Sequence, residues 1–177
     1  MKPDIGITEN NTQAVAFELS KLLADEYVLV TKIKNAHWNV EGADFYDKHK
    51  FFETQFGQLD AFIDSIAERI RTLGHYAPGT MQAFLSLTQL TEKGFDKNDS
   101  NRFVKELLED HESIIFRLRE NIYRVASEFH DIGTSDFMTG LMESHEKMAW
   151  FLRSHLVNTK KPMGLLTDVK MEKSVSL

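Results

Sequence analysis

GHYAPGTMQAFLSLTQLTEKGFDKN, residues 74–98, lies between two long stretches of helical periodicity and decides the fold. Gly74 at its start, followed by Pro78 and Gly79, ends the preceding helix. A single short apolar piece, AFLSLTQL, interrupts an otherwise polar segment. We therefore expect a long crossover that carries one short helix.

Four long helices surround this crossover, because apolar residues recur with a period of about 3.6 and no alternating strand pattern occurs. The predicted boundaries are a first helix that stops before Gly42, a second from about Asp44 to Leu73, a third entered through Asp99 or Ser100, and a fourth that begins near Thr134 or Ser135. The first and last links are short, so each joins an antiparallel pair. The long link makes the second and third helices parallel, which predicts the ferritin-like, all-α form of the four-helix bundle.

Composition limits the class of protein. The 177 residues suffice for one domain with a real core; we expect residues 1–157 to form the bundle with a short N-terminal arm, and 158–177 to form a flexible tail. The absence of cysteine excludes disulfides and thiolate metal sites. The net charge of −6 argues against a generic nucleic-acid binder. No run approaches 18 apolar residues and no leader segment is visible, so the sequence predicts a cytoplasmic protein without a membrane partner.

Two histidines flank the first predicted turn in HWNVEGADFYDKH, residues 37–49. His37 ends the first helix and His49 lies in the first turns of the second, so a hairpin at Gly42 brings them near each other. A single helical histidine is usually structural, so neither residue alone indicates a ligand.

The second helix adds carboxylates to this pair. Counted at 100° per residue, His49 shares a stripe of about 100° with Glu53, Asp64 and Glu68, and with Asp60. The alternative is a solvated charged face, in which Lys48, Lys50 and Arg69 neutralise the acids.

One helix cannot close such a site. His49 and Asp64 are about 22 Å apart along the helix, whereas a metal–ligand bond is about 2 Å. His49 and Glu68, like Glu53 and Asp64, lie symmetrically about a point between Gln58 and Leu59. An antiparallel second copy, approaching closely at Gly57, would therefore complete two equivalent sites, although a different antiparallel helix would serve as well. No histidine follows a glutamate by three positions, so the usual intrachain di-iron motif is absent.

These motifs resemble the Dps family, the DNA-binding proteins from starved cells or mini-ferritins. His37-Trp38-Asn39-Val40 with Gly42, His49 and Glu53 looks like its first signature, and Asp64 followed by SIAERIRTLG looks like its second. The similarity covers residues 8–156. Lys48 departs from the family, which usually has Leu or Val before the histidine.

The resemblance implies a hollow dodecamer that oxidises Fe(II) with hydrogen peroxide and stores the Fe(III) mineral, protecting against oxidative damage. It implies iron ligands at two-fold interfaces, with His37 and His49 from one subunit, Asp64 and Glu68 from the other, and Glu53 as an accessory ligand. Imidazole with carboxylate suits iron but also zinc, manganese and cobalt. The methionines of the fourth helix are explained as core residues, so no haem is expected.

Two further roles come from family position. Trp38 is a candidate radical trap, and an interface aromatic that only packs is the alternative. Asp136, with Glu128 and Asp131 nearby, is a candidate for an iron-entry pore, and helix capping is the alternative for an acid at this position. His111 and His145 lie in apolar stripes and are best explained as satisfied interior or interface residues. His75, His130 and His155 have no partners at ligand spacing.

The competing function is a structural protein that compacts DNA through its C-terminal tail. That tail holds Lys160, Lys161, Lys170 and Lys173 against Asp168 and Glu172, an excess that twelve copies would multiply by avidity. The N-terminal residues 1–13 carry no basic arm. Each chain contributes a formal net charge of −6, so we expect the shell as a whole to repel DNA. DNA binding is therefore the less favoured interpretation.

Overall fold

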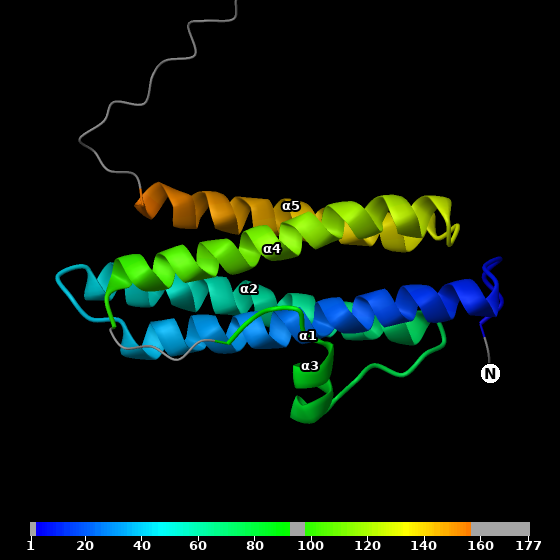
Figure 1. Ribbon diagram of the computed structural model, residues 1–177, viewed down its shortest axis with the longest axis horizontal. Helices are drawn as coiled ribbons and strands as arrows, with labels where there is room; N and C mark the ends of the chain where they lie inside the picture. The colour runs from blue at the N-terminus through cyan, green and yellow to red at the C-terminus, as the bar shows by residue number, and fades with distance from the viewer. Residues whose placement is uncertain (1–2, 93–97, 157–177) are drawn as a thin grey trace, which may run out of the picture.

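The computed structural model describes residues 3–92 and 98–156, and the predicted tail lies outside these ranges. Figure 1 shows four long helices lying side by side, α1 (Glu9–Asn39), α2 (Phe45–Thr72), α4 (Ser100–Ser127) and α5 (Ile132–His155). The short helix α3 (Met81–Leu87) lies within the long connection and projects from the side of α1. The described residues contain no strand, so the predicted ferritin-like bundle with its crossover is confirmed.

The helices begin at the polar residues that the sequence offers as caps, with one difference. Asp99 caps α4 by accepting a hydrogen bond from the Arg102 amide. The predicted start of the last helix near Thr134 or Ser135 was late, because α5 begins at Ile132. Asp131 is its N-cap and accepts the Thr134 amide at 2.9 Å.

Asp44 stands at the predicted N-cap of α2, but its carboxylate makes no capping bond there. It accepts a hydrogen bond from the Ser100 hydroxyl at 2.8 Å and pairs with Lys48 at 3.2 Å. The Ser100 hydrogen bond, more than Lys48, lowers the pKa of Asp44 against the opposing effect of burial. The start of α2 is thereby joined to the start of α4.

The core lies between the four long helices and is filled by fully buried aliphatic and aromatic side chains. Those with almost no exposed surface include Leu19, Leu29 and Ile33 of α1, Phe52, Leu59 and Ile66 of α2, Phe103 and Ile114 of α4, and Leu152 of α5. Burial of each such side chain stabilises the fold by about 1.5–3 kcal/mol. Among the described helices none is both long and apolar enough to cross a membrane.

A buried carboxylate fastens the crossover to the bundle. Oδ1 of Asp25 in α1 accepts the Thr88 hydroxyl at 2.8 Å and the backbone amides of Gln89 at 2.6 Å and Leu90 at 3.3 Å. Its other oxygen accepts Arg117 of α4 at 2.7 Å. Asp25 is 2% exposed, so these bonds form away from water and stabilise one path of the chain.

Replacing Asp25 with alanine is expected to lower the free energy of unfolding by about 3–5 kcal/mol, because Arg117 and the Gln89 amide lose an acceptor in a largely buried place. Urea unfolding followed by circular dichroism measures the loss. The matched control is Asp60→Ala, since Asp60 is exposed and pairs only with Lys34 at 3.3 Å. The control should lose about 1 kcal/mol or less. Equal losses in the two variants would contradict the anchoring role.

Candidate metal centre

The predicted turn between α1 and α2 brings His37 and His49 together. The chain turns at Gly42, whose φ of 127° lies where residues with a side chain are strained. The Glu41 amide donates to the carbonyl oxygen of Asn98 at 3.0 Å, which ties the turn to the segment before α4. The two imidazole rings stack with centroids 3.8 Å apart and planes 20° from parallel.

Each histidine binds the backbone of the other. Nδ1 of His37 lies 2.8 Å from the carbonyl oxygen of His49, and Nδ1 of His49 lies 2.9 Å from the carbonyl oxygen of His37. A carbonyl oxygen only accepts, so both Nδ1 atoms carry the proton and donate. When either ring is neutral, its Nε2 consequently keeps a free lone pair, and among the described residues no hydrogen bond engages either Nε2.

This arrangement is the one that metal-binding histidines usually show, in which the second nitrogen donates to a carbonyl and fixes the tautomer and the ring orientation. Aromatic side chains support the rings. Phe56 meets His37 edge-on at 5.2 Å, and the Phe45 ring lies 5.3 Å from that of His49. Two hydrogen bonds and these ring contacts hold both imidazole rings in place, so both Nε2 atoms are oriented before a cation binds.

Glu53 lies one turn beyond His49 and within the influence of both imidazoles. Lys50, whose Nζ is 2.7 Å from Glu53 Oε2, is the main cause of its lowered pKa, and charge on His37 and His49 adds to the effect. Both side chains are exposed, so a cation can replace Lys50 at little cost. Glu53 is therefore accessible to a cation, and its role as an accessory ligand stays a prediction.

Asp64 and Glu68 lie further along the outer face of α2. The exposed stripe of this helix contains Glu53, Gly57, Asp60, Ala61, Asp64 and Glu68. Within the described ranges, Asp60 pairs with Lys34 and Glu53 with Lys50, whereas Asp64 and Glu68 make no ion pair. The described residues also contain no group of three His, Asp or Glu positioned to share a metal ion. One chain thus presents two separate parts of a ligand set.

The burial of Leu59 limits which residues can lie in contact at the predicted two-fold crossing. Leu59 is fully buried in its own core and cannot contact a second copy. Gly57 and Gln58 are exposed, and a Cβ added at Gly57 would meet nothing within 4 Å in this chain. Close approach of another helix is therefore open at Gly57.

The candidate pore residues differ in availability. Glu128 and Asp136 are exposed near the α4–α5 turn, and Glu128 lies 3.4 Å from Arg124. Asp131 is 2% exposed, caps α5, and pairs with Arg69 of α2 at 3.3 Å. For Asp131 the capping alternative describes the structure, because its carboxylate is already bound. Trp38 is exposed beside His37.

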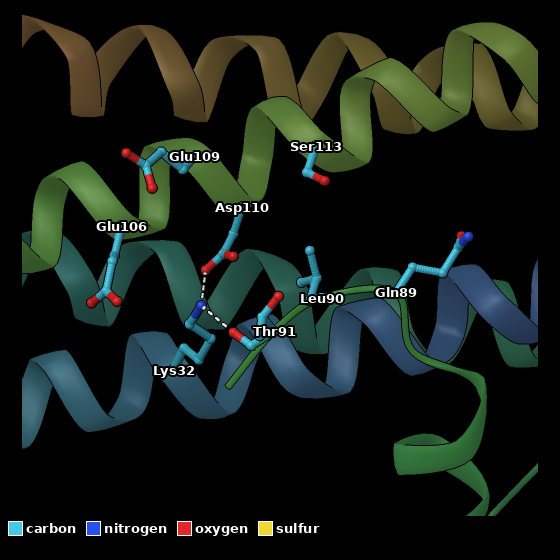
Figure 2. Close-up of a pocket in the computed structure, with 8 residues that line it drawn as sticks. All are labelled: Lys32, Gln89, Leu90, Thr91, Glu106, Glu109, Asp110 and Ser113. Atoms are coloured by element: carbon cyan, nitrogen blue, oxygen red, sulfur yellow. Dashed lines mark hydrogen bonds and ion pairs between the residues drawn. The ribbon is translucent and has the colours of Figure 1, made fainter. Parts of the chain in front are cut away.

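A cavity of about 170 Å³ lies elsewhere, between α1, α4 and the crossover (Figure 2), and contains none of the predicted ligands. Figure 2 shows Lys32 reaching between Asp110 and the Thr91 carbonyl oxygen, which accepts its hydrogen bond at 3.2 Å. Burial raises the pKa of Asp110, and the Lys32 bond opposes this. The ammonium group of Lys32 thus supplies a positive charge to the wall of this cavity.

Sequence reasoning missed the polar residues of the core. His111 and His145 are fully buried and bound to each other, but Glu26, the partner of His145, was not singled out. The available signal was the pair Asp25-Glu26 within the otherwise apolar stretch LLADEYVLV. Two adjacent acids there cannot both face solvent, so at least one of them has a partner inside the protein.

The bundle and its paired histidines define a ferritin-like protein, and the ferritin-like domain family matches residues 18–161. The DNA protection during starvation protein 2 of Bacillus anthracis is 33% identical over 138 residues, which cover 78% of this chain and 93% of that protein. An uncharacterized low temperature-induced protein of Nostoc is 44% identical over 175 residues, covering 92% and 98%.

Solved structures agree. DpsC from Streptomyces coelicolor superposes with a TM-score of 0.85 at 28% identity, covering 93% of this chain and 95% of that one. The Dps protein from Vibrio cholerae, described as a member of a superfamily of ferritin-like diiron-carboxylate proteins, gives 0.81 at 28% identity and covers 89% and 98%. The chain belongs to the Dps family.

Replacing Gly42 with alanine is expected to cost about 1–2 kcal/mol of stability, because a side chain disfavours a φ of 127°. Relaxing the turn also separates the two rings, so zinc, used here as a probe of imidazole binding, should bind more weakly by calorimetry. Gly79→Ala serves as the control, since its Cβ would meet nothing within 4 Å and its φ is ordinary. Unchanged zinc affinity in Gly42→Ala would show that the turn does not set the site.

Proposed function

We propose that this protein is a ferroxidase and iron-storage protein that oxidises Fe(II) and retains the Fe(III) product inside a hollow shell. The observation that carries the proposal is the histidine pair with two oriented, unengaged Nε2 atoms, together with unpaired carboxylates on the same helix that the pair cannot reach. Membership of a family with diiron-carboxylate relatives supports iron as the substrate.

In this proposal each site is shared by two chains. His37 and His49 with Glu53 come from one chain, and Asp64 and Glu68 come from the other. The carboxylates bind Fe(II) and favour Fe(III), because anionic oxygen ligands stabilise the higher charge. Two Fe(II) ions give one electron each to hydrogen peroxide, which takes up two protons and is reduced to two water molecules. Consuming peroxide by a pair of electrons avoids release of hydroxyl radicals.

The complete assembly is proposed to be a dodecamer. A two-fold dimer closes two sites, and twelve chains of 20.4 kDa give a shell of about 245 kDa. Exposed Glu128 and Asp136 are the proposed acids of the entry pore, where negative charge raises the local concentration of Fe(II). Trp38 beside His37 is the proposed trap for stray oxidising equivalents.

Protection of DNA follows from this chemistry without contact with DNA. Relatives carry the name DNA protection during starvation protein. Removal of Fe(II) and peroxide protects nucleic acid at a distance, whereas direct binding has to overcome a charge of −6 per chain. Direct DNA binding through the C-terminal tail remains the second candidate, and that tail lies outside the described residues.

Asp64→Asn and His49→Ala are each expected to slow peroxide-driven Fe(II) oxidation by at least about tenfold. Loss of a residue that only supports a metal ligand already lowers activity by about tenfold or more, so loss of a ligand should cost at least as much. Initial rates measured by absorbance of Fe(III) test this, with circular dichroism to show intact helices. Asp60→Asn on the same helix is the control and should react like the parent. Parent rates in both ligand variants would exclude these residues as ligands.

Mixed shells test whether the site is shared. One subunit carries His37→Ala with His49→Ala, and the other carries Asp64→Asn with Glu68→Gln. Each homo-oligomer has only damaged sites, whereas a mixed dimer regains one intact site and leaves the other doubly damaged. Co-assembly, proved by native mass spectrometry of tagged chains, should therefore restore rapid oxidation. Mixed shells as slow as their parents would show that ligands are not shared between chains.

A further inference from the structure

Three ionisable side chains form a hydrogen-bonded chain in the centre of the bundle, apart from the candidate metal centre. Glu26 of α1, His145 of α5 and His111 of α4 are each 0% exposed. Oε1 of Glu26 lies 2.8 Å from His145 Nε2, and the Nδ1 atoms of His145 and His111 lie 2.9 Å apart. Glu26 Oε2 and His111 Nε2 are buried and have no hydrogen-bond partner among the described residues.

The contact between the two rings limits how many protons they can hold. A hydrogen bond between two Nδ1 atoms needs one nitrogen that donates and one that accepts. Glu26 accepts from His145, so His145 is the ring that carries the positive charge when the pair is protonated once. If both rings were protonated, two N–H groups and two positive charges would face each other at 2.9 Å in a medium of low dielectric.

Among the described residues, no other ion pair or hydrogen bond reaches either histidine. Helix α2 places the Phe62 ring near His145, with the two ring centroids 5.7 Å apart. Burial lowers the pKa of His111 well below 6.5, and positive charge on His145 lowers it further. The acids beside the two histidines along α4 and α5 are already paired: Asp110 with Lys32, Glu112 with Arg153 and Glu146 with Arg119.

We propose that Glu26, His145 and His111 form a proton-limited lock, which joins α1, α5 and α4 while the two rings share at most one proton and which opens when acid forces a second proton onto them. The lock is a regulatory feature of the fold and does not depend on the iron chemistry. Its opening separates helices from both halves of the bundle, so acid loosens the subunit from within.

The sign of the pH dependence follows from the number of protons bound. The unfolded chain binds two protons on these histidines in acid, and the folded chain binds at most one. The stabilisation is therefore fully present above pH 6.5 and is lost as the pH falls towards the lowered pKa of His111. When the unfolded chain binds one more proton than the folded chain, the unfolding equilibrium constant rises about tenfold for each unit by which the pH falls, once the pH is well below 6.5.

His111→Gln is the informative variant, because an amide can still donate to His145 but does not titrate. Urea unfolding of the full-length assembly at pH 6.5 and 5.5 should show a rise in the unfolding constant that is about fivefold smaller in His111→Gln than in the parent, because about half of the unfolded histidine is already protonated at pH 6.5. The control His130→Asn removes an exposed histidine at φ 57°, where asparagine is tolerated, and should match the parent. Identical pH dependence in parent and His111→Gln would overturn the proposal.

A measurement on the unaltered protein keeps the proposal testable if His111→Gln fails to fold. Solid-state NMR of the native assembly, labelled with ¹⁵N at histidine, reports the protonation of each ring nitrogen. At pH 6 the proposal expects one protonated and one bare Nδ1 in mutual hydrogen-bond contact. Two protonated Nδ1 atoms in the folded core would overturn it.

Discussion

The carboxylate of Asp25 is the constraint on which the arrangement of the helices depends. One of its oxygens fixes the crossover and the other holds Arg117 of α4. Because α2 ends before this crossover and α4 begins after it, the two helices run parallel only if the crossover returns along the length of the bundle. A buried anion with four donors makes that return path the favourable one, since leaving the carboxylate unpaired in the core costs several kcal/mol.

Antiparallel packing of α1 and α2 then determines where the two histidines of the candidate metal centre lie. Since the two helices meet at a tight turn, the last turn of one lies against the first turn of the other, and His37 reaches His49. Their reciprocal bonds to backbone carbonyls make the pair stiff, because the rings are tied to the helices themselves and not to mobile side chains. Asp64 and Glu68 cannot join this pair, since a helix holds them four or more turns away.

The sequence was sufficient for those features that depend on periodicity and spacing. The four helices, the crossover and the pairing of His37 with His49 follow from apolar repeats, Gly42 and the length of residues 74–98. It was insufficient where a side chain has several partners within reach. Asp44 could cap α2 or bind Ser100, and the tertiary bond to Ser100 decided. Asp131 could face a pore or cap α5, and its local capping bond together with Arg69 decided. The part of the site that a second chain supplies is a prediction from symmetry alone.

The acidic residues of this chain divide by environment, and that division separates stability from chemistry. Asp25 and Glu26 are buried and accept hydrogen bonds from donors of their own chain, so they join helices within the bundle. Asp64 and Glu68 are exposed and make no ion pair within the described ranges. A carboxylate that recruits a metal ion has to remain unpaired until the ion arrives, and an exposed position such as the solvent-facing stripe of α2 permits this without the cost of a buried, unpaired charge. We propose that a ligand set on that stripe is completed by a surface from outside the chain, so assembly and metal binding are expected to depend on each other.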